Sequence, residues 1–330
     1  MAVTPPASGV SGEGRGRRLA SLALQLVLTV VVTVFVTRQV GLGVEDLRAL
    51  DPAIWTPRWG VFALSCGLLL AGYLASAALW GILVAELGGP RLGATAVVPV
   101  FLVANLGRYL PGKLWQIAGL AVLALRLGVP ASVSTAAAVL GQAMALGGAV
   151  LVGSLALMGR EESLGGWSLL SLVVVAGVLA VALLPPLQRR AVRIWYRLAR
   201  HPGEQVAPGA GSTLRWLVLY TLNWVLYAGS FWVLARSLEL PGSALEVGSA
   251  FAAAYVLGYL ALFAPAGIGV REGFLVLFLS PAMGAGPAGA LAIVARVWTT
   301  GVEVIPALLL WGRSLMAGDG PPAAAGEGSR

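Results

Sequence analysis

The sequence of 330 residues contains little of the chemistry on which soluble enzymes and metal sites depend. It has one cysteine, Cys66, and one histidine, His201. A single cysteine excludes a disulfide framework within the chain and a cluster of thiolate metal ligands. A single histidine excludes a metal site built from several imidazoles and histidine-dependent phosphatase chemistry. We therefore expect neither a metal nor a cofactor.

Charged residues are also scarce, at 11% of the sequence, whereas soluble domains contain roughly 25%. Hydrophobic residues make up 58%, and the mean hydropathy is +0.87. The apolar segments leave no room for a folded soluble domain of about 50 residues or more. The sequence therefore predicts an all-α polytopic membrane protein whose chemistry takes place in or at the membrane.

The net charge of +8 indicates topology rather than a nucleic-acid partner, because arginines of membrane proteins collect on the cytoplasmic side. Six arginines and one acid lie within residues 189–215, so residues 188–213 are predicted to form a basic cytoplasmic loop. The spacing of its arginines over 189–200 suits an amphipathic helix on anionic lipid headgroups. Membrane lipids are thus the expected partners, and nucleic acid is not.

The two ends of the chain are polar or rich in glycine and proline, and both are predicted to be disordered and cytoplasmic, over residues 1–18 and 314–330. The apolar run at 19–37 is too long for a signal peptide and has no prompt cleavage pattern, so it is predicted to be a retained transmembrane helix. These features predict a multi-pass protein of the cytoplasmic (inner) membrane. The sequence also allows a homo-oligomer.

Two short polar runs interrupt the apolar segments. The first, residues 105–116, contains Arg108, a Pro111-Gly112 pair and Lys113, the only lysine in the chain. The apolar legs beside it are each about 21 Å long as helices, which is shorter than the hydrocarbon core of roughly 30 Å. We therefore predict a re-entrant hairpin at 94–127, and the second run, Pro265 to Gly273, predicts another at 247–283.

The two halves of the chain have matching spacing. Pro111 and Pro265 are 154 residues apart, and the same offset pairs Gln142 with Arg296. Residues 19–158 and 159–313 are thus predicted to be two membrane repeats, each with three crossings and one hairpin. An odd number of crossings inverts the second repeat relative to the first, and such repeats place a binding site between their broken helices near the midplane.

Charged side chains gather near the two breaks, where an ion is costly unless it faces a partner, a ligand or water. Glu272 is adjacent to Arg271, and Arg296 and Glu303 lie on one helix face, so these four can also form a structural ion-pair network. Arg108 and Lys113 have no acid nearby in sequence, which favours an anion site, for example for phosphate. The predicted substrate site comprises Asn105, Arg108, Tyr109, Lys113, Trp115, Gln116, Arg271, Glu272, Arg296 and Glu303, with turns at Pro111, Gly112, Pro265, Gly267 and Gly269. The aromatic members can equally be packing or interface anchors.

The run Asn105, Gly107-Arg108-Tyr109-Leu110-Pro111-Gly112-Lys113 and Trp115, together with Pro265 to Gly273, resembles the two signature stretches of the lysylphosphatidylglycerol synthase transmembrane-domain family. The similarity covers roughly residues 19–313. The resemblance implies a flippase-like fold with two oppositely entering hairpins, which moves a phosphate-containing lipid between leaflets. The soluble aminoacyl-transfer domain of full-length synthases has no counterpart in this sequence, so lysyl-lipid synthesis is not implied.

Three functions are compatible with the sequence. The first is a non-enzymatic flippase for an anionic or aminoacylated phospholipid or a polyprenyl-phosphate-linked sugar. The second is a membrane glycosyl or lipid transferase that uses Glu45, Asp46 or Asp51 in the first outer loop, and the third is a small-solute or ion transporter. We favour the flippase, because the outer loop is short and contains no second pair of carboxylates.

Overall fold

The computed structural model describes residues 56–109, 115–158, 167–184, 210–261 and 267–316, together with the single residues 186, 190 and 264. Every regular element in these residues is a helix. The helices are α3 (Trp59–Glu86), α4 (Ala94–Asn105), the 3-10 helix η2 (Leu106–Tyr109), α5 (Trp115–Leu125), α6 (Ala131–Met158), α7 (Trp167–Leu183), α9 (Ala210–Ser237), α10 (Ala244–Leu260), α11 (Val270–Met283) and α12 (Ala285–Met316). The predicted helix at 19–37 lies outside the described residues.

Four helices in the described part of the chain are long and apolar enough to cross a membrane. Their qualifying spans are Trp59–Glu86, Ala131–Ala156, Gly211–Ser237 and Ala285–Gly312, which belong to α3, α6, α9 and α12. A helix of 28 residues is about 42 Å long, more than the hydrocarbon core of roughly 30 Å. The prediction of an all-α polytopic membrane protein is confirmed.

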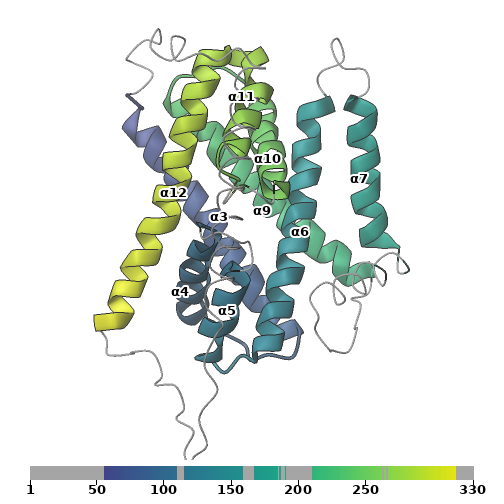
Figure 1. Ribbon diagram of the computed structural model, residues 1–330, viewed down its shortest axis with the longest axis vertical. Coiled ribbons are helices and arrows are strands. Elements are labelled where there is room, and N and C mark those ends of the chain that lie inside the picture. The colour runs from purple at the N-terminus through teal and green to yellow at the C-terminus, as the bar shows by residue number, and fades with distance from the viewer. Residues whose placement is uncertain are drawn as a thin grey trace, which may run out of the picture.

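Two pairs of shorter helices lie at opposite ends of this bundle. α4 packs against α5 in the lower half of Figure 1, and α10 packs against α11 in the upper half. α4 has 12 residues and α5 has 11, so each is only about 17–18 Å long. α12 runs along the whole height of the view, past both pairs. The inner ends of the pairs thus come together about halfway along the long helices.

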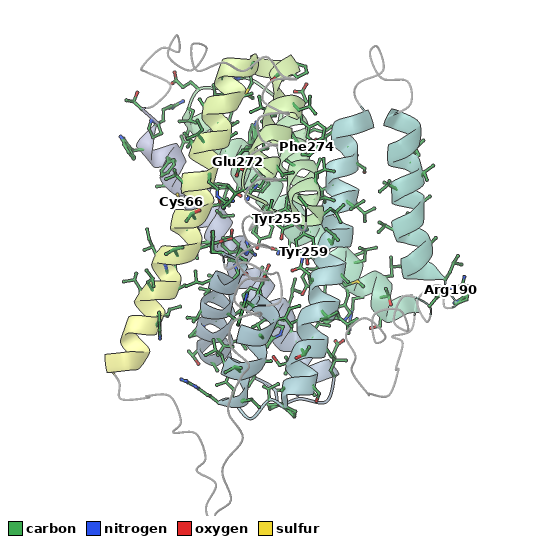
Figure 2. The ribbon with its side chains drawn as sticks, viewed as in Figure 1. Cys66, Arg190, Tyr255, Tyr259, Glu272 and Phe274 are labelled. Atoms are coloured by element: carbon green, nitrogen blue, oxygen red, sulfur yellow. The ribbon has the colours of Figure 1, made fainter. Side chains whose placement is uncertain are left out.

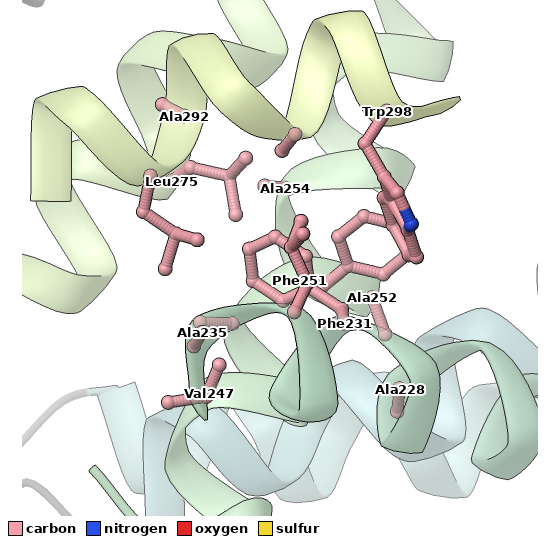
Figure 3. Packing of buried hydrophobic residues seen from close by; sticks show 14 of the residues in the cluster. Ala228, Phe231, Ala235, Val247, Phe251, Ala252, Ala254, Leu275, Ala292 and Trp298 are labelled. Carbon is pink, nitrogen blue, oxygen red and sulfur yellow. The ribbon is translucent and has the colours of Figure 1, made fainter. Parts of the chain in front are cut away.

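The core consists of aromatic and small side chains that let helices approach closely. Phe231 of α9 stacks on Phe251 of α10 with ring centroids 4.4 Å apart, and Trp298 of α12 lies 6.3 Å from Phe251 (Figure 3). Gly153 brings α6 against α10, where an added Cβ would lie 2.7 Å from the backbone nitrogen of Ala253. Lipid tails are as apolar as these side chains, so tight packing is what stabilises such contacts.

Several helix ends differ from the sequence predictions. α9 begins at Ala210, inside the predicted basic loop. α10 begins at Ala244, because Ser243 and Glu246 form a capping box there. α11 begins at Val270, so the second break is shorter than predicted. α12 continues to Met316, into the predicted tail, since Ser314-Leu315-Met316 contains no helix breaker.

Candidate functional site

The first break is held together by one buried amide. Asn105, the last residue of α4, is 2% exposed. Its Oδ1 accepts a hydrogen bond of 2.9 Å from Arg108 Nη2 and one of 2.8 Å from Gln116 Nε2. The Oδ1 atom of Asn105 thus joins the Arg108 side chain of η2 to the first turn of α5.

Arg108 is ion-paired with Glu303 of α12. Its Nη1 donates to Glu303 Oε1 at 2.6 Å, and the hydroxyl of Tyr109 donates to Oε2 at 2.5 Å. The hydroxyl of Tyr73 of α3 also donates to Oε1. Glu303 is 3% exposed, and three donors satisfy its carboxylate. Arg108 has no acid nearby in sequence, but in the structure its acidic partner lies 195 residues further along the chain.

The second break is shaped by glycine backbone. Gly267 and Gly269 have φ values of 68° and 78°, a left-handed conformation that costs other residues roughly 1–2 kcal/mol. An added Cβ at Gly267 would also lie 3.0 Å from the carbonyl oxygen of Gly258. The N–H of Gly269 donates to Glu272 Oε2 at 2.6 Å. This bond caps α11 and holds the Glu272 carboxylate at the first turn.

Arg271 emerges from that turn into the protein interior. Its Nε and Nη2 are buried and have no hydrogen-bond partner among the residues that the structure describes. The guanidinium lies over the ring of Phe251, 4.7 Å from the centroid. Glu272, its neighbour in sequence, forms an ion pair of 3.6 Å with Arg296 of α12. Buried donors without acceptors cost free energy, so within the described ranges Arg271 is an unsatisfied charged group of this site.

Two adjoining cavities meet at the two breaks. The first has a volume of about 100 Å³ and extends between α3, α6 and α9, and the second has a volume of about 80 Å³. The residues that line both are Arg108, Gln116, Ile117, Gln142, Tyr255, Arg271 and Thr299. Figure 2 shows Tyr255 and Tyr259 of α10 near mid-height in the bundle, with Glu272 above them. The shared wall therefore contains both Arg108 and Arg271.

The cavities lie halfway along the helices that are long enough to span a membrane. Tyr73 is at the middle of α3, and Asn223 is at the middle of α9. Glu303 is within one turn of the middle of α12. Polar side chains at this depth in apolar helices are rare and mark substrate or ion pathways.

Comparison with protein families agrees with this geometry. The family described as "Lysylphosphatidylglycerol synthase TM region" matches residues 22–307. The chain belongs to this family. The matched residues include both breaks and all residues that line the two cavities. A comparison with curated proteins finds no match.

In this member of the lysylphosphatidylglycerol synthase transmembrane-region family, most predicted site residues lie together. Arg108, Tyr109, Gln116, Arg271, Arg296 and Glu303 line the second cavity, and Asn105 lines the first. Trp115 is 54% exposed and lines neither cavity. Lys113, Pro111, Gly112 and Pro265 lie outside the described residues, as do Glu45, Asp46 and Asp51.

The sequence analysis missed several polar residues that line the first cavity. They are Tyr73, Ser76, Asn223, Tyr227, Tyr255 and Thr299. A signal was available for Asn223, because an amide in the middle of an otherwise apolar helix needs a partner or a ligand. Gln142, which the offset of 154 residues pairs with Arg296, lines the second cavity together with Arg296.

Proposed function

We propose that this protein moves a phosphate-containing lipid between membrane leaflets, with the phosphate bound by Arg271 and the acyl or prenyl chains remaining in the bilayer. One observation carries the proposal. The buried guanidinium of Arg271 lies in the wall shared by two cavities, and two of its nitrogens have no acceptor in the described part of the chain.

An anionic ligand would supply the hydrogen-bond acceptors that this guanidinium lacks in the described part of the chain. Arginine presents its donors in a planar fork that matches two oxygens of a phosphate. A buried donor left unpaired costs roughly 1–3 kcal/mol, and a bound phosphate would remove that cost. Nε–H and Nη2–H form one edge of the guanidinium, and neither has an acceptor among the described residues, so one phosphate could accept from both.

The charge balance of the site favours the same ligand. Arg108 pairs with Glu303, and Arg296 pairs with Glu272. Together with Arg271, these described side chains sum to one positive charge. A single anionic phosphate would neutralise this excess, which is costly in a medium of low dielectric constant.

A lipid, rather than a free ion, fits the position of the site. The cavities lie halfway along the long apolar helices, where a phosphate headgroup crossing the bilayer meets its highest barrier. We propose that α4–α5 and α10–α11 are re-entrant hairpins of two inverted repeats, which meet at this depth. The described residues hold no feature that favours the transferase or the ion transporter.

Leaflet exchange in proteoliposomes tests this function. Phosphatidylcholine vesicles would carry trace amounts of tail-labelled phosphatidylglycerol or of a labelled polyprenyl phosphate, and label accessible from outside would be followed over time. We expect wild-type protein to accelerate exchange of at least one lipid and Arg271→Met to reduce it to the rate of protein-free vesicles. Arg236→Met, at the end of α9 and away from both cavities, is the matched control and should behave as wild type. Equal exchange by wild type and Arg271→Met would contradict the proposal.

A further inference from the structure

The first cavity contains a second set of unsatisfied polar groups, which the phosphate site does not use. Nε1 of Trp80 on α3 and Oδ1 of Asn223 on α9 are buried and have no hydrogen-bond partner within the described ranges. Trp80 is 1% exposed and Asn223 is 6% exposed, and both line this cavity. The residues of the cavity wall thus include one donor and one acceptor that have no partner in the described ranges, and both are neutral.

Asn223 is fixed by its neighbours rather than free to turn away. Its Nδ2 donates to Ser76 Oγ at 2.8 Å, and Ser76 Oγ lies 3.0 Å from the hydroxyl of Tyr227. If the amide is turned over, its oxygen and nitrogen exchange places. In either orientation one polar atom of the buried amide lacks a partner among the described residues, so the argument for a ligand group does not depend on the assignment.

The charges around the first cavity disfavour a cationic ligand group. Of the described residues that line it, only Arg108 and Arg271 are charged, and both are cations. Glu303 lines the second cavity, and its carboxylate is already bound by Arg108, Tyr73 and Tyr109. An amine or quaternary ammonium in the first cavity would therefore meet the positive charge of Arg271, and no carboxylate among the described lining residues would compensate its own charge.

The remaining wall suits a group rich in hydroxyls. Rings of Trp80, Phe101 and Trp224 provide flat apolar faces, while Asn223 and Gln142 provide amides that can both donate and accept. The volume of about 100 Å³ is several times the roughly 10–15 Å³ that one water needs. Apolar faces combined with a few neutral, directional polar groups are the usual composition of a site for a neutral polar ligand.

We propose that the first cavity binds a neutral, hydroxyl-rich group attached to the lipid phosphate, namely a polyol or a sugar, and that Trp80 and Asn223 determine this specificity. The inference rests on the proposed function, because a phosphate at Arg271, which lines both cavities, directs its substituent into the first. Polyol phospholipids and polyprenyl-phosphate-linked sugars share this chemistry. An aminoacylated phospholipid does not.

Two matched pairs of tail-labelled lipids test the proposal in the leaflet-exchange assay. One pair is phosphatidic acid and phosphatidylinositol, and the other is polyprenyl phosphate and the same lipid carrying a phosphate-linked hexose. We expect the hydroxyl-rich member of one pair to exchange about tenfold faster, the factor that corresponds to roughly 1.4 kcal/mol. The pair that shows the preference identifies the source as a glycerophospholipid or a polyprenyl carrier.

Two substitutions link that preference to the cavity. Trp80→Phe removes the indole N–H and keeps an aromatic ring, and Asn223→Leu removes the amide at similar volume. Each should reduce the preference at least about fivefold while the bare phosphate lipid exchanges as in wild type. Trp59→Phe, at a residue that is 72% exposed, is the control and should leave the preference unchanged.

The outcomes separate this inference from the proposed function. If wild-type protein moves none of the four lipids, the proposed function itself fails. If bare phosphate lipids move but their hydroxyl-rich partners are no faster, or if both cavity variants keep the full preference, the inference is overturned and the phosphate site stands. Faster exchange of lysyl-phosphatidylglycerol than of phosphatidylglycerol would also overturn it.

Discussion

The two breaks of this protein each place an arginine in the bundle, and the described residues bind these two arginines differently. Arg108 at the first break is bound by the Asn105 amide and the Glu303 carboxylate. Arg271 at the second break has two buried nitrogens without partners in the part of the chain that is described. The same residue type thus forms an ion pair at one break, and at the other it is the group to which we propose that a phosphate binds.

The breaks also differ in how their backbones are held. Side-chain hydrogen bonds hold the first break together, because Gln116 and Arg108 both donate to Asn105. Glycines form the second, with positive φ at Gly267 and Gly269 and close packing of Gly258 against Arg271. An added Cβ at Gly258 would lie 2.9 Å from Arg271 Cβ. The glycines therefore determine where the unpaired guanidinium stands.

The largest effect is expected when the satisfied arginine loses its partner. Glu303→Leu leaves Arg108, whose side chain is 26% exposed, without a carboxylate, and breaking a pair whose acid is buried in this way costs up to about 3–5 kcal/mol. Thermal unfolding in detergent measures the loss. Glu303→Gln should be milder, because an amide oxygen at the position of Oε1 still accepts from Arg108 and Tyr73, although the NH2 group at the position of Oε2 cannot accept from Tyr109. A Glu303→Leu protein as stable as wild type would show that Arg108 is not held by this pair.

A smaller loss is expected from the backbone of the second break. Gly267→Ala forces a Cβ onto a residue with φ of 68° and brings it 3.0 Å from the Gly258 carbonyl oxygen. We expect a loss of about 1–3 kcal/mol in the free energy of unfolding. Gly301→Ala on α12, where a Cβ meets open space, is the control and should gain up to about 1 kcal/mol. Equal stability of both variants would contradict the conclusion that the second break requires glycine at position 267.

A loss of about 1 kcal/mol is expected at the outer end of the second pair of helices. Ser243→Ala removes the N-cap of α10, whose hydroxyl accepts from the Glu246 N–H at 3.2 Å. The Ser243 backbone N–H, followed by its hydroxyl, lowers the pKa of Glu246.

This lowered pKa gives the cap a pH dependence of known sign. Glu246 contributes stability at pH above its unfolded pKa, and the contribution is lost as pH falls through its folded value. The difference in unfolding temperature between wild type and Ser243→Ala should thus narrow in acid. A difference that widens in acid would contradict the capping box.

The smallest effect on stability is expected at the unsatisfied arginine. Arg271→Met removes a buried cation with unpaired donors, so the unfolding free energy of the lipid-free protein should change by less than about 1 kcal/mol or increase. Comparing the changes in unfolding free energy of Glu303→Leu and Arg271→Met measures the difference between the two breaks most clearly. A loss of several kcal/mol in Arg271→Met would mean that the protein itself satisfies this guanidinium.

The helices could be predicted from the sequence because apolar runs end at glycine, proline or charge. α6 begins directly after Pro130, and α3 ends shortly before the Gly88-Gly89 pair. The sequence prediction places the start of this segment at residue 247, which is too late, because the capping box at Ser243 starts α10 about one turn before the apolar run.

The site could be predicted in part. Charges at the breaks stand out because ions are rare in apolar segments, and Arg271 was found in this way. The pairing of Arg108 with Glu303 joins residues 195 positions apart, and no local pattern reveals it. Asn223 and Trp80 were missed, since which face of an apolar helix borders a cavity depends on how its neighbours pack.

Mass spectrometry of the phosphate lipid that copurifies with the protein tests the assignment of Arg271 most directly. Wild type and the control Arg236→Met should retain the same lipid in similar amounts per protein. Arg271→Met should unfold at a temperature no lower than that of lipid-free wild type and retain little of this lipid. Retention of as much phosphate lipid by Arg271→Met as by wild type would contradict the assignment of the anion site to Arg271.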